Sequence, residues 1–259
     1  MRQLTTIVLF GSSLMACMNR GGGTDVDSAE SAVDSSDAVG SESDLMVATM
    51  DGAEVAGLLP VTADQIAVRI AANVAGRWAG DCAKVTQNGG NVTVVYNDCT
   101  GPRGLVHVTG QLDVAITVSG TTITAHGTSS NMMINRATMV IDATASYAVN
   151  GTTKTLTVAT NGSGTGPRGN EIEHEGNYTI TWDAASQCRT IDGNWHTDLG
   201  VRERSNDVNL SRCAGSCPTG TVTHHFLAGA SLTITFNGTA TATWSTSTGR
   251  SGTVALGCQ

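Results

Sequence analysis

The amino-acid sequence predicts a mainly β fold: a large antiparallel meander, curled into a sandwich or a partly open barrel, with one short N-terminal helix. Two observations lead to this prediction. Apolar and polar residues alternate along many short runs, as they do in a sheet with one solvated face. Turn signals separate the runs, among them Ser119-Gly120, Asn150-Gly151, Asp192-Gly193 and Asn237-Gly238. We therefore expect about a dozen strands in one disulfide-stapled domain of residues 59–259.

The alternation is clearest in four stretches, residues 106–118, 139–149, 178–182 and 232–236. The helix is predicted over residues 63–75. Thr62 can cap it together with Gln65, and isoleucine or valine recurs at every fourth position from Ile66 to Val74. A sheet of this many strands cannot lie flat, so the helix should cover one of its edges or its mouth.

The N-terminus is typical of a secretory signal, because Arg2 precedes an apolar run that is too short to cross a bilayer. At its end, Leu14-Met15-Ala16-Cys17 resembles the lipobox of bacterial lipoproteins, although Met15 is bulkier than the usual residue. The resemblance implies that residues 1–16 are a signal peptide and that Cys17 carries the lipid, palmitate included. Met18 in place of aspartate implies the outer membrane of a Gram-negative cell. A plain cleaved signal with an incidental cysteine is the alternative.

Residues 17–58 are expected to form a disordered tether, since residues 21–44 are rich in Gly, Ser and acid and contain no Lys or Arg. The tether also holds most of the formal charge of −8. From Val61 onward there are 13 Asp and Glu against 12 Lys and Arg. This near balance predicts no basic face for nucleic acid and no acidic face for a cationic partner.

Six cysteines remain after Cys17, and in an exported chain an even number predicts three disulfides with 15 possible connectivities. They are Cys82, Cys99, Cys188, Cys213, Cys217 and Cys258. The hairpin signal Asn88-Gly89-Gly90 favours a bond between Cys82 and Cys99. Bonds between Cys188 and Cys213 and between Cys217 and Cys258 then follow by elimination. Zinc bound by Cys213, Cys217, His224 and His225 is the alternative, but the spacing fits no finger-like template.

The sequence Thr-Gly-Pro-Arg-Gly occurs at residues 100–104 and 165–169, with a fainter copy at 248–252. Proline and glycine at these positions predict a shared turn between strands. Arg103 and Arg168 would lie at loop tips, where they contact a ligand or are simply solvated. The second copy also has GxGxxG spacing, but it leads into a strand rather than a helix and so predicts no phosphate site.

No GxSxG, P-loop or HExxH motif occurs in the sequence, which predicts no catalytic residue, cofactor or metal. Glu171, Glu173 and Glu175 beside His174 are expected on a solvated strand face, with an acidic metal-binding stripe as the alternative.

Trp195 has polar neighbours that include His196, so it is either a core residue or a platform on which a sugar stacks.

A wider resemblance rests on Asp98–Gly104, on Cys188 with Asp192-Gly193-Asn194-Trp195, on Cys213–Gly220, and on Gly249–Gly252 leading to Cys258. Together these segments resemble uncharacterised, cysteine-bearing bacterial lipoproteins, those of myxobacteria in particular, over residues 75–259. The resemblance implies a cellular location and a fold, and it supplies no catalytic residue.

Two classes of function are therefore expected. The first is a non-catalytic lipoprotein with a binding or structural role at the cell surface, whose partner is an envelope protein or a glycan. Its ligand contacts would lie in strand-end loops carrying Arg103, Arg168, Trp195 and His196. The second is a hydrolase whose site is assembled from distant strand ends. Neither expectation fixes the oligomeric state.

The anchor can be tested by replacing Cys17 with Ser and expressing both chains in a Gram-negative host. Acyl chains stabilise membrane binding by about 0.8 kcal/mol per buried CH₂. We expect the parent chain in the detergent-soluble membrane fraction and the variant in the aqueous fraction. A variant that stays in the membrane fraction would show that Cys17 is not the anchor.

Overall fold

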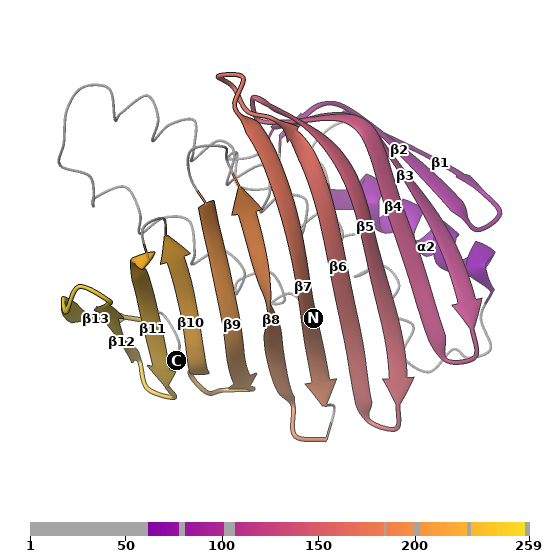
Figure 1. The fold of residues 1–259 in the computed structure, drawn as a ribbon. Helices are drawn as coiled ribbons and strands as arrows, with labels where there is room; N and C mark the ends of the chain where they lie inside the picture. The colour runs from indigo at the N-terminus through magenta and orange to yellow at the C-terminus, as the bar shows by residue number, and fades with distance from the viewer. Residues whose placement is uncertain are drawn as a thin grey trace.

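The computed structural model describes residues 62–77, 81–100, 107–183, 185–198, 203–226 and 229–256. The predicted signal peptide, Cys17, the tether, Arg103 and Cys258 lie outside these residues. The described part of the chain contains one helix, α2 (Ala63–Arg77), and 13 strands in a single antiparallel sheet whose spatial order is the order of the sequence (Figure 1). The predicted fold class, a large antiparallel meander with one short helix, is confirmed.

The strands lengthen toward the middle of the sheet and shorten again toward its C-terminal edge. They are β1 (Ala83–Asn88), β2 (Asn91–Thr100), β3 (His107–Ser119), β4 (Thr122–Ile134), β5 (Ala137–Asn150), β6 (Thr153–Thr165), β7 (Glu171–Asp183), β8 (Cys188–Asp198), β9 (Glu203–Cys213), β10 (Thr219–Phe226), β11 (Ser231–Asn237), β12 (Thr241–Thr246) and β13 (Ser251–Ala255). The sheet does not close, so β1 and β13 are its two edges.

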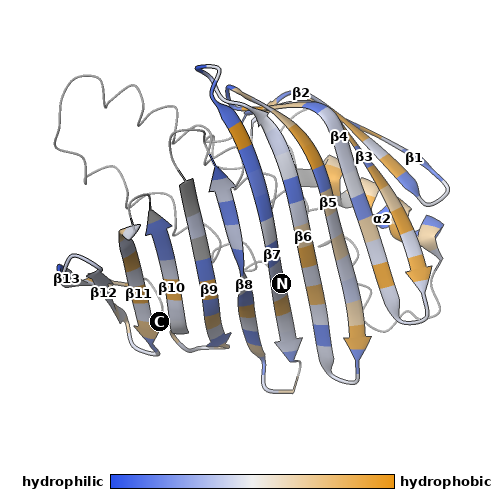
Figure 2. Cartoon of the chain, viewed as in Figure 1, coloured by the Kyte–Doolittle hydropathy of each residue, from blue (hydrophilic) through white to orange (hydrophobic). Residues whose placement is uncertain are grey.

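The sheet has an inner face, which carries the buried residues and packs on α2, and an outer face, which is exposed to solvent. In β5, for example, Met139, Ile141 and Ala143 are buried and alternate with exposed Thr138 and Val140. The largest fully buried side chains of the inner face come from β2 to β7. Hydropathy therefore changes from residue to residue along each of these strands (Figure 2).

Helix α2 begins with the predicted capping box. The backbone N–H of Gln65 donates to Thr62 Oγ1 at 3.3 Å, and the backbone N–H of Thr62 donates to Gln65 Oε1 at 3.0 Å. Two otherwise unpaired N–H groups of the first turn are thus satisfied. Ile66, Ile70 and Val74 are buried, and the helix contacts β1, β2 and β3, which curve over it (Figure 1). No helix in the described part of the chain is long and apolar enough to span a membrane.

Register shifts interrupt three strand pairs next to the helix, with one extra residue in β2 and one in β4. The register shifts between Tyr96 and Cys99 in the β2–β3 pair, between Thr109 and Asp113 in the β3–β4 pair, and between Ser129 and Met132 in the β4–β5 pair. A bulge bends its strand and increases the local twist. From the β5–β6 pair to the β12–β13 pair the register has no such shift.

Most of the predicted turns are confirmed. The chain reverses at Gly89-Gly90, at Gly120, at Gly151, in residues 166–170 and in residues 247–250. In the second of the two Thr-Gly-Pro-Arg-Gly copies, the N–H of Gly169 donates to the C=O of Gly166 at 3.0 Å, and Gly169 has a φ of 78°. Proline and glycine therefore occupy the turn positions that the sequence predicts.

The predicted turn at Asp192-Gly193 is wrong, because both residues lie inside β8. Gly193 has a φ of 157°, and a Cβ atom there would overlap the carbonyl oxygen of Asn177 and would come within 2.5 Å of Tyr178 Cα in β7. Glycine is thus required by the close approach of the neighbouring strand rather than by a chain reversal.

Two predicted disulfides are confirmed. Cys82 is bonded to Cys99 at the start of β1, and Cys188 is bonded to Cys213 across the β8–β9 pair. Cys217 is also in a disulfide, and its predicted partner Cys258 lies outside the described residues. The alternative of zinc is wrong for Cys213, whose sulfur is already bonded to another cysteine.

The Cys82–Cys99 bond closes a loop of 17 residues at the edge strand that α2 covers. Replacing both cysteines with Ala should lower the free energy of unfolding by about 3 kcal/mol, because the unfolded chain regains the entropy of that loop. Urea denaturation measures the change, and an unchanged m-value would show that the same surface is exposed. The paired control, Cys188→Ala with Cys213→Ala, opens a loop of 25 residues and should lose a similar amount. A loss below about 1 kcal/mol in the first variant would contradict the prediction.

Candidate functional site

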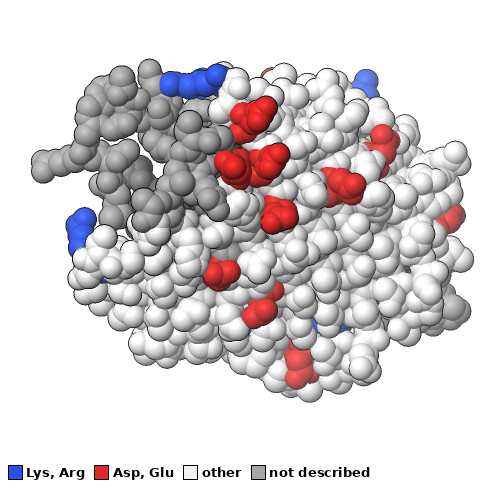
Figure 3. Space-filling model, viewed as in Figure 1, with Lys and Arg blue, Asp and Glu red and all other residues white. Residues whose placement is uncertain are grey.

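The outer face of the sheet carries most of the acidic side chains of the described strands. They are Asp113 of β3, Asp142 of β5, Glu171, Glu173, Glu175 and Asp183 of β7, Asp192 and Asp198 of β8, and Asp207 of β9. Among the basic residues of the described strands, the register places only Lys84 on this face. Figure 3 shows the carboxylates spread across the face and the basic groups at its margins.

This distribution corrects the expectation that the domain has no acidic face. The domain is near neutral in total, but its acidic and basic side chains lie on different parts of its surface. Arg189 and Arg212 lie on the inner side of β8 and β9, and Arg136, Arg168 and Arg250 lie in turns. A count of charges cannot show this, because the face of a strand residue depends on its register.

Hydroxyl groups fill the outer face beside the carboxylates. One cross-strand row, here called the threonine row, has a Thr, Ser, Asp or Asn at every position from β3 to β13. Its members are Thr117, Thr124, Ser146, Thr157, Thr179, Asp192, Asn209, Thr221, Thr235, Thr243 and Thr253. Neighbouring hydroxyls interact directly in places, for example Thr124 Oγ1 with Ser146 Oγ at 3.3 Å.

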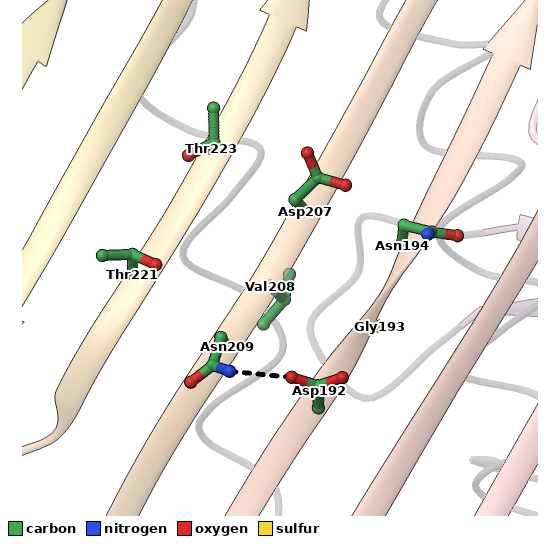
Figure 4. Close-up of a pocket in the computed structure, with 8 residues that line it drawn as sticks. All are labelled: Asp192, Gly193, Asn194, Asp207, Val208, Asn209, Thr221 and Thr223. Atoms are coloured by element: carbon green, nitrogen blue, oxygen red, sulfur yellow. Dashed lines mark hydrogen bonds between the residues drawn. The ribbon is translucent and has the colours of Figure 1, made fainter.

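A shallow hollow of about 280 Å³ opens on the outer face across β8, β9 and β10 (Figure 4). Its polar lining alternates acid and amide, with Asp192 opposite Asn209 and Asn194 opposite Asp207, and Thr221 and Thr223 on the third strand. Asn209 Nδ2 donates to Asp192 Oδ2 at 2.8 Å, which orders the two side chains. Gly193 and Val208 complete the lining. The hollow presents both donors and acceptors to a hydroxyl-rich or amide-bearing group.

Two short histidine–carboxylate contacts lie on the same face. His126 Nε2 is 2.7 Å from Asp142 Oδ1, and His225 Nε2 is 2.9 Å from Asp207 Oδ2. All four side chains are substantially exposed, between 46% and 66%. The described residues contain no group of three or more His, Cys, Asp or Glu side chains arranged to hold a metal ion.

The acidic strand β7 has the geometry of a solvated face, as predicted. Glu171, Glu173 and Glu175 are exposed, whereas His174 points to the inner face and is 3% exposed. His174 Nε2 is 3.1 Å from Thr160 Oγ1 and His174 Nδ1 is 3.0 Å from Thr197 Oγ1, so both ring nitrogens have hydroxyl partners on the flanking strands. Burial lowers the pKa of His174 to about 4. The imidazole ring is therefore neutral and links β6, β7 and β8 through hydrogen bonds, an arrangement called here the His174 clamp.

The predicted ligand residues do not share one loop. Arg103 lies outside the described residues, and Arg168 is exposed in the turn between β6 and β7. Trp195 and His196 lie inside β8 and so point to opposite faces. Trp195 is half-buried on the inner face beside Gly176, and His196 is on the outer face opposite Glu175.

The hollow was not predicted from the sequence. The sequence predicts a turn at Asp192 and gives Asn194 only as a polar neighbour of Trp195, and it does not single out Asp207 and Asn209. The available signal was the alternation Asp-x-Asn in β8 and Asp-x-Asn in β9, which places four polar side chains on one face once the strands pair antiparallel. Comparison with protein-family models, curated proteins and solved structures found no match.

The clamp at His174 predicts a pH dependence of stability. Its pKa is about 4 in the folded chain and about 6.5 in the unfolded chain, so the unfolded state binds the proton first as the pH falls. The free energy of unfolding should therefore decrease between about pH 6.5 and pH 4, by up to about 3 kcal/mol, and be insensitive to this group above that range.

Urea denaturation at a series of pH values measures this slope. His174→Gln should flatten it, and His126→Gln, which changes an exposed histidine of the outer face, should keep it. Equal slopes in the parent chain and in His174→Gln would contradict the assignment.

Proposed function

We propose that the chain is a lipid-anchored protein of the outer membrane and that its β domain binds a partner through the outer face of the sheet without catalysing a reaction. The N-terminal sequence supports the anchor, through the lipobox-like segment that ends at Cys17. The segregation of acidic side chains onto the outer face is the observation that carries the binding role. A face with nine carboxylates and one lysine in its described strands complements a basic protein surface.

The rigidity of the sheet supports the same proposal. The outer face is fixed by continuous strand pairing from β1 to β13 and by the Cys82–Cys99 and Cys188–Cys213 bonds. A partner therefore meets side chains that are already in place, which lowers the entropic cost of association. The predicted tether would hold this face away from the membrane.

A hydrolase assembled from distant strand ends is the alternative. Acid–base catalysis needs two groups whose pKa values are pushed apart in an enclosed site. In the described part of the chain, the short His126–Asp142 and His225–Asp207 contacts are exposed on an open face. This exposure supports binding over catalysis.

Glycan binding is a second candidate function, favoured by the hollow across β8, β9 and β10. Side-chain carboxylates and amides at neighbouring positions can pair with adjacent hydroxyls of a sugar. Asn194→Ala with Asn209→Ala should abolish capture of a neutral oligosaccharide on a glycan array if the hollow is such a site. Unchanged capture by this variant would argue against it.

The role of the acidic face can be tested with a lysine-rich peptide as probe and, in parallel, with proteins solubilised from the envelope of the native cell. Glu173→Gln with Glu175→Gln removes two carboxylates from the face. Asp64→Asn with Asp81→Asn removes the same charge from α2 and from the segment before β1. The first variant should bind the peptide at least about ten-fold more weakly, a loss of about 1.4 kcal/mol.

The control variant should bind like the parent chain. Binding of the parent should also weaken between 0.15 M and 1 M salt, where the Debye length falls from about 8 Å to about 3 Å. Equal losses in the two variants would mean that net charge alone attracts the probe, and turnover in a hydrolase screen would favour the alternative function.

A further inference from the structure

The two edges of the open sheet differ in how they are protected. At the β1 edge, α2 packs on the strand, the Cys82–Cys99 bond fixes its start, and its second residue, Lys84, carries a charge. Charged residues and covering helices are the usual devices that prevent edge strands from pairing with other chains. The β13 edge has neither device within the described residues. Its sequence, Ser-Gly-Thr-Val-Ala, contains no charge and no proline.

The hydrogen bonds of β13 show which of its backbone groups are available. The N–H of Leu256 donates to the C=O of Ala240 at 2.8 Å, and the N–H of Thr246 donates to the C=O of Arg250 at 2.8 Å. These bonds and the register assign Gly252 and Val254 to the side that faces β12. The N–H and C=O groups of Ser251, Thr253 and Ala255 therefore point away from the sheet. Among the described residues no other strand pairs with them.

We propose that β13 pairs antiparallel with β13 of a second copy of this chain, about a two-fold axis at Thr253. In this register Thr253 lies opposite Thr253 of the other copy, and Ser251 lies opposite Ala255. These are the residues whose backbone groups point outward, so every outward N–H of one chain meets an outward C=O of the other. A register shifted by one residue would place outward groups opposite inward ones and lose these bonds.

The side chains fit the same register. On the inner face, Val254 of one copy lies opposite Gly252 of the other. Gly252 is covered by the Trp244 ring, to which an added Cβ would come within 2.7 Å. Trp244 and Val254 are only half-buried in the single chain, so the second Val254 would pack beside the ring and remove apolar surface of both from water. On the outer face, the threonine row continues from Thr243 through Thr253 into the second copy.

Self-pairing of β13 also agrees with the asymmetry of the edges. Pairing of β13 with the β1 edge of another copy would be heterologous and would lead to open filaments, whereas the two-fold contact closes on itself. Lys84 and α2 oppose the filament. The absence of charge on β13 leaves no like-charge repulsion across the axis.

The test uses the full chain carrying Cys17→Ser, so that lipid does not drive association, with mass measured by light scattering over a ten-fold range of concentration. The expected mass is near twice the 26.5 kDa of one chain. Thr253→Lys keeps the backbone N–H but brings two like charges to the axis, and Thr253→Pro removes the outward N–H without removing a bond to β12. Both should give monomers, and Thr253→Val should remain dimeric.

Hydrogen exchange gives a second measurement that does not depend on mass. The amides of Ser251, Thr253 and Ala255 should be protected in the parent and in Thr253→Val, and should exchange freely in Thr253→Lys, whose melting temperature reports whether it is folded. A parent chain that is monomeric throughout, a dimer that survives both Thr253→Lys and Thr253→Pro, or protection only in the presence of another protein's extended segment would each overturn the proposal.

Discussion

The antiparallel register is the constraint on which the rest of the structure depends. Because side chains alternate between the two faces of a strand, a slip of one residue would exchange the inner and outer faces along its whole length. From β5 to β13 the pairing continues without a shift, and each strand presents its apolar set to the same side as its neighbour. The threonine row, the segregation of acidic side chains onto the outer face and the hollow all follow from this common register.

The close pairing of neighbouring strands also explains why glycine occurs inside them. Gly193 and Gly220 have φ values of 157° and 112°, and an added Cβ at either position would overlap a backbone carbonyl oxygen of the neighbouring strand, that of Asn177 or of Asn209. At these places the backbones approach too closely for a side chain. The hollow on the outer face adjoins one of them, at Gly193.

The sequence predicted what depends on local pattern. Alternation identified the strands, the Thr62 and Gln65 pair identified the start of α2, and Asn88-Gly89-Gly90 identified a hairpin that brings Cys82 to Cys99. The turn predicted at Asp192-Gly193 was wrong. This dipeptide is typical of turns, but here it lies inside β8, where glycine allows the close approach of β7.

The candidate site could not be predicted in the same way, because it is built from residues that are adjacent only after pairing. Asp192 and Asn209 are 17 positions apart in the sequence and meet through the β8–β9 register. Conversely, Trp195 and His196 are neighbours in the sequence and lie on opposite faces. The prediction that the domain has no acidic face was wrong for the same reason, because the total charge does not show on which face of the sheet each charged side chain lies.

An open meander has to terminate somewhere, and this chain terminates its two edges differently. An isolated pair of strands is marginally stable in water, but each β13 belongs to a 13-stranded sheet that already holds it extended. The proposed pairing would join two sheets into one continuous outer face, doubling the array of carboxylates and hydroxyls that a partner meets. If Cys17 anchors the chain, neighbouring copies meet in two dimensions at the length of their tethers. This arrangement favours the contact further, because linking two modules to a common support replaces their bulk concentration by a much higher effective one.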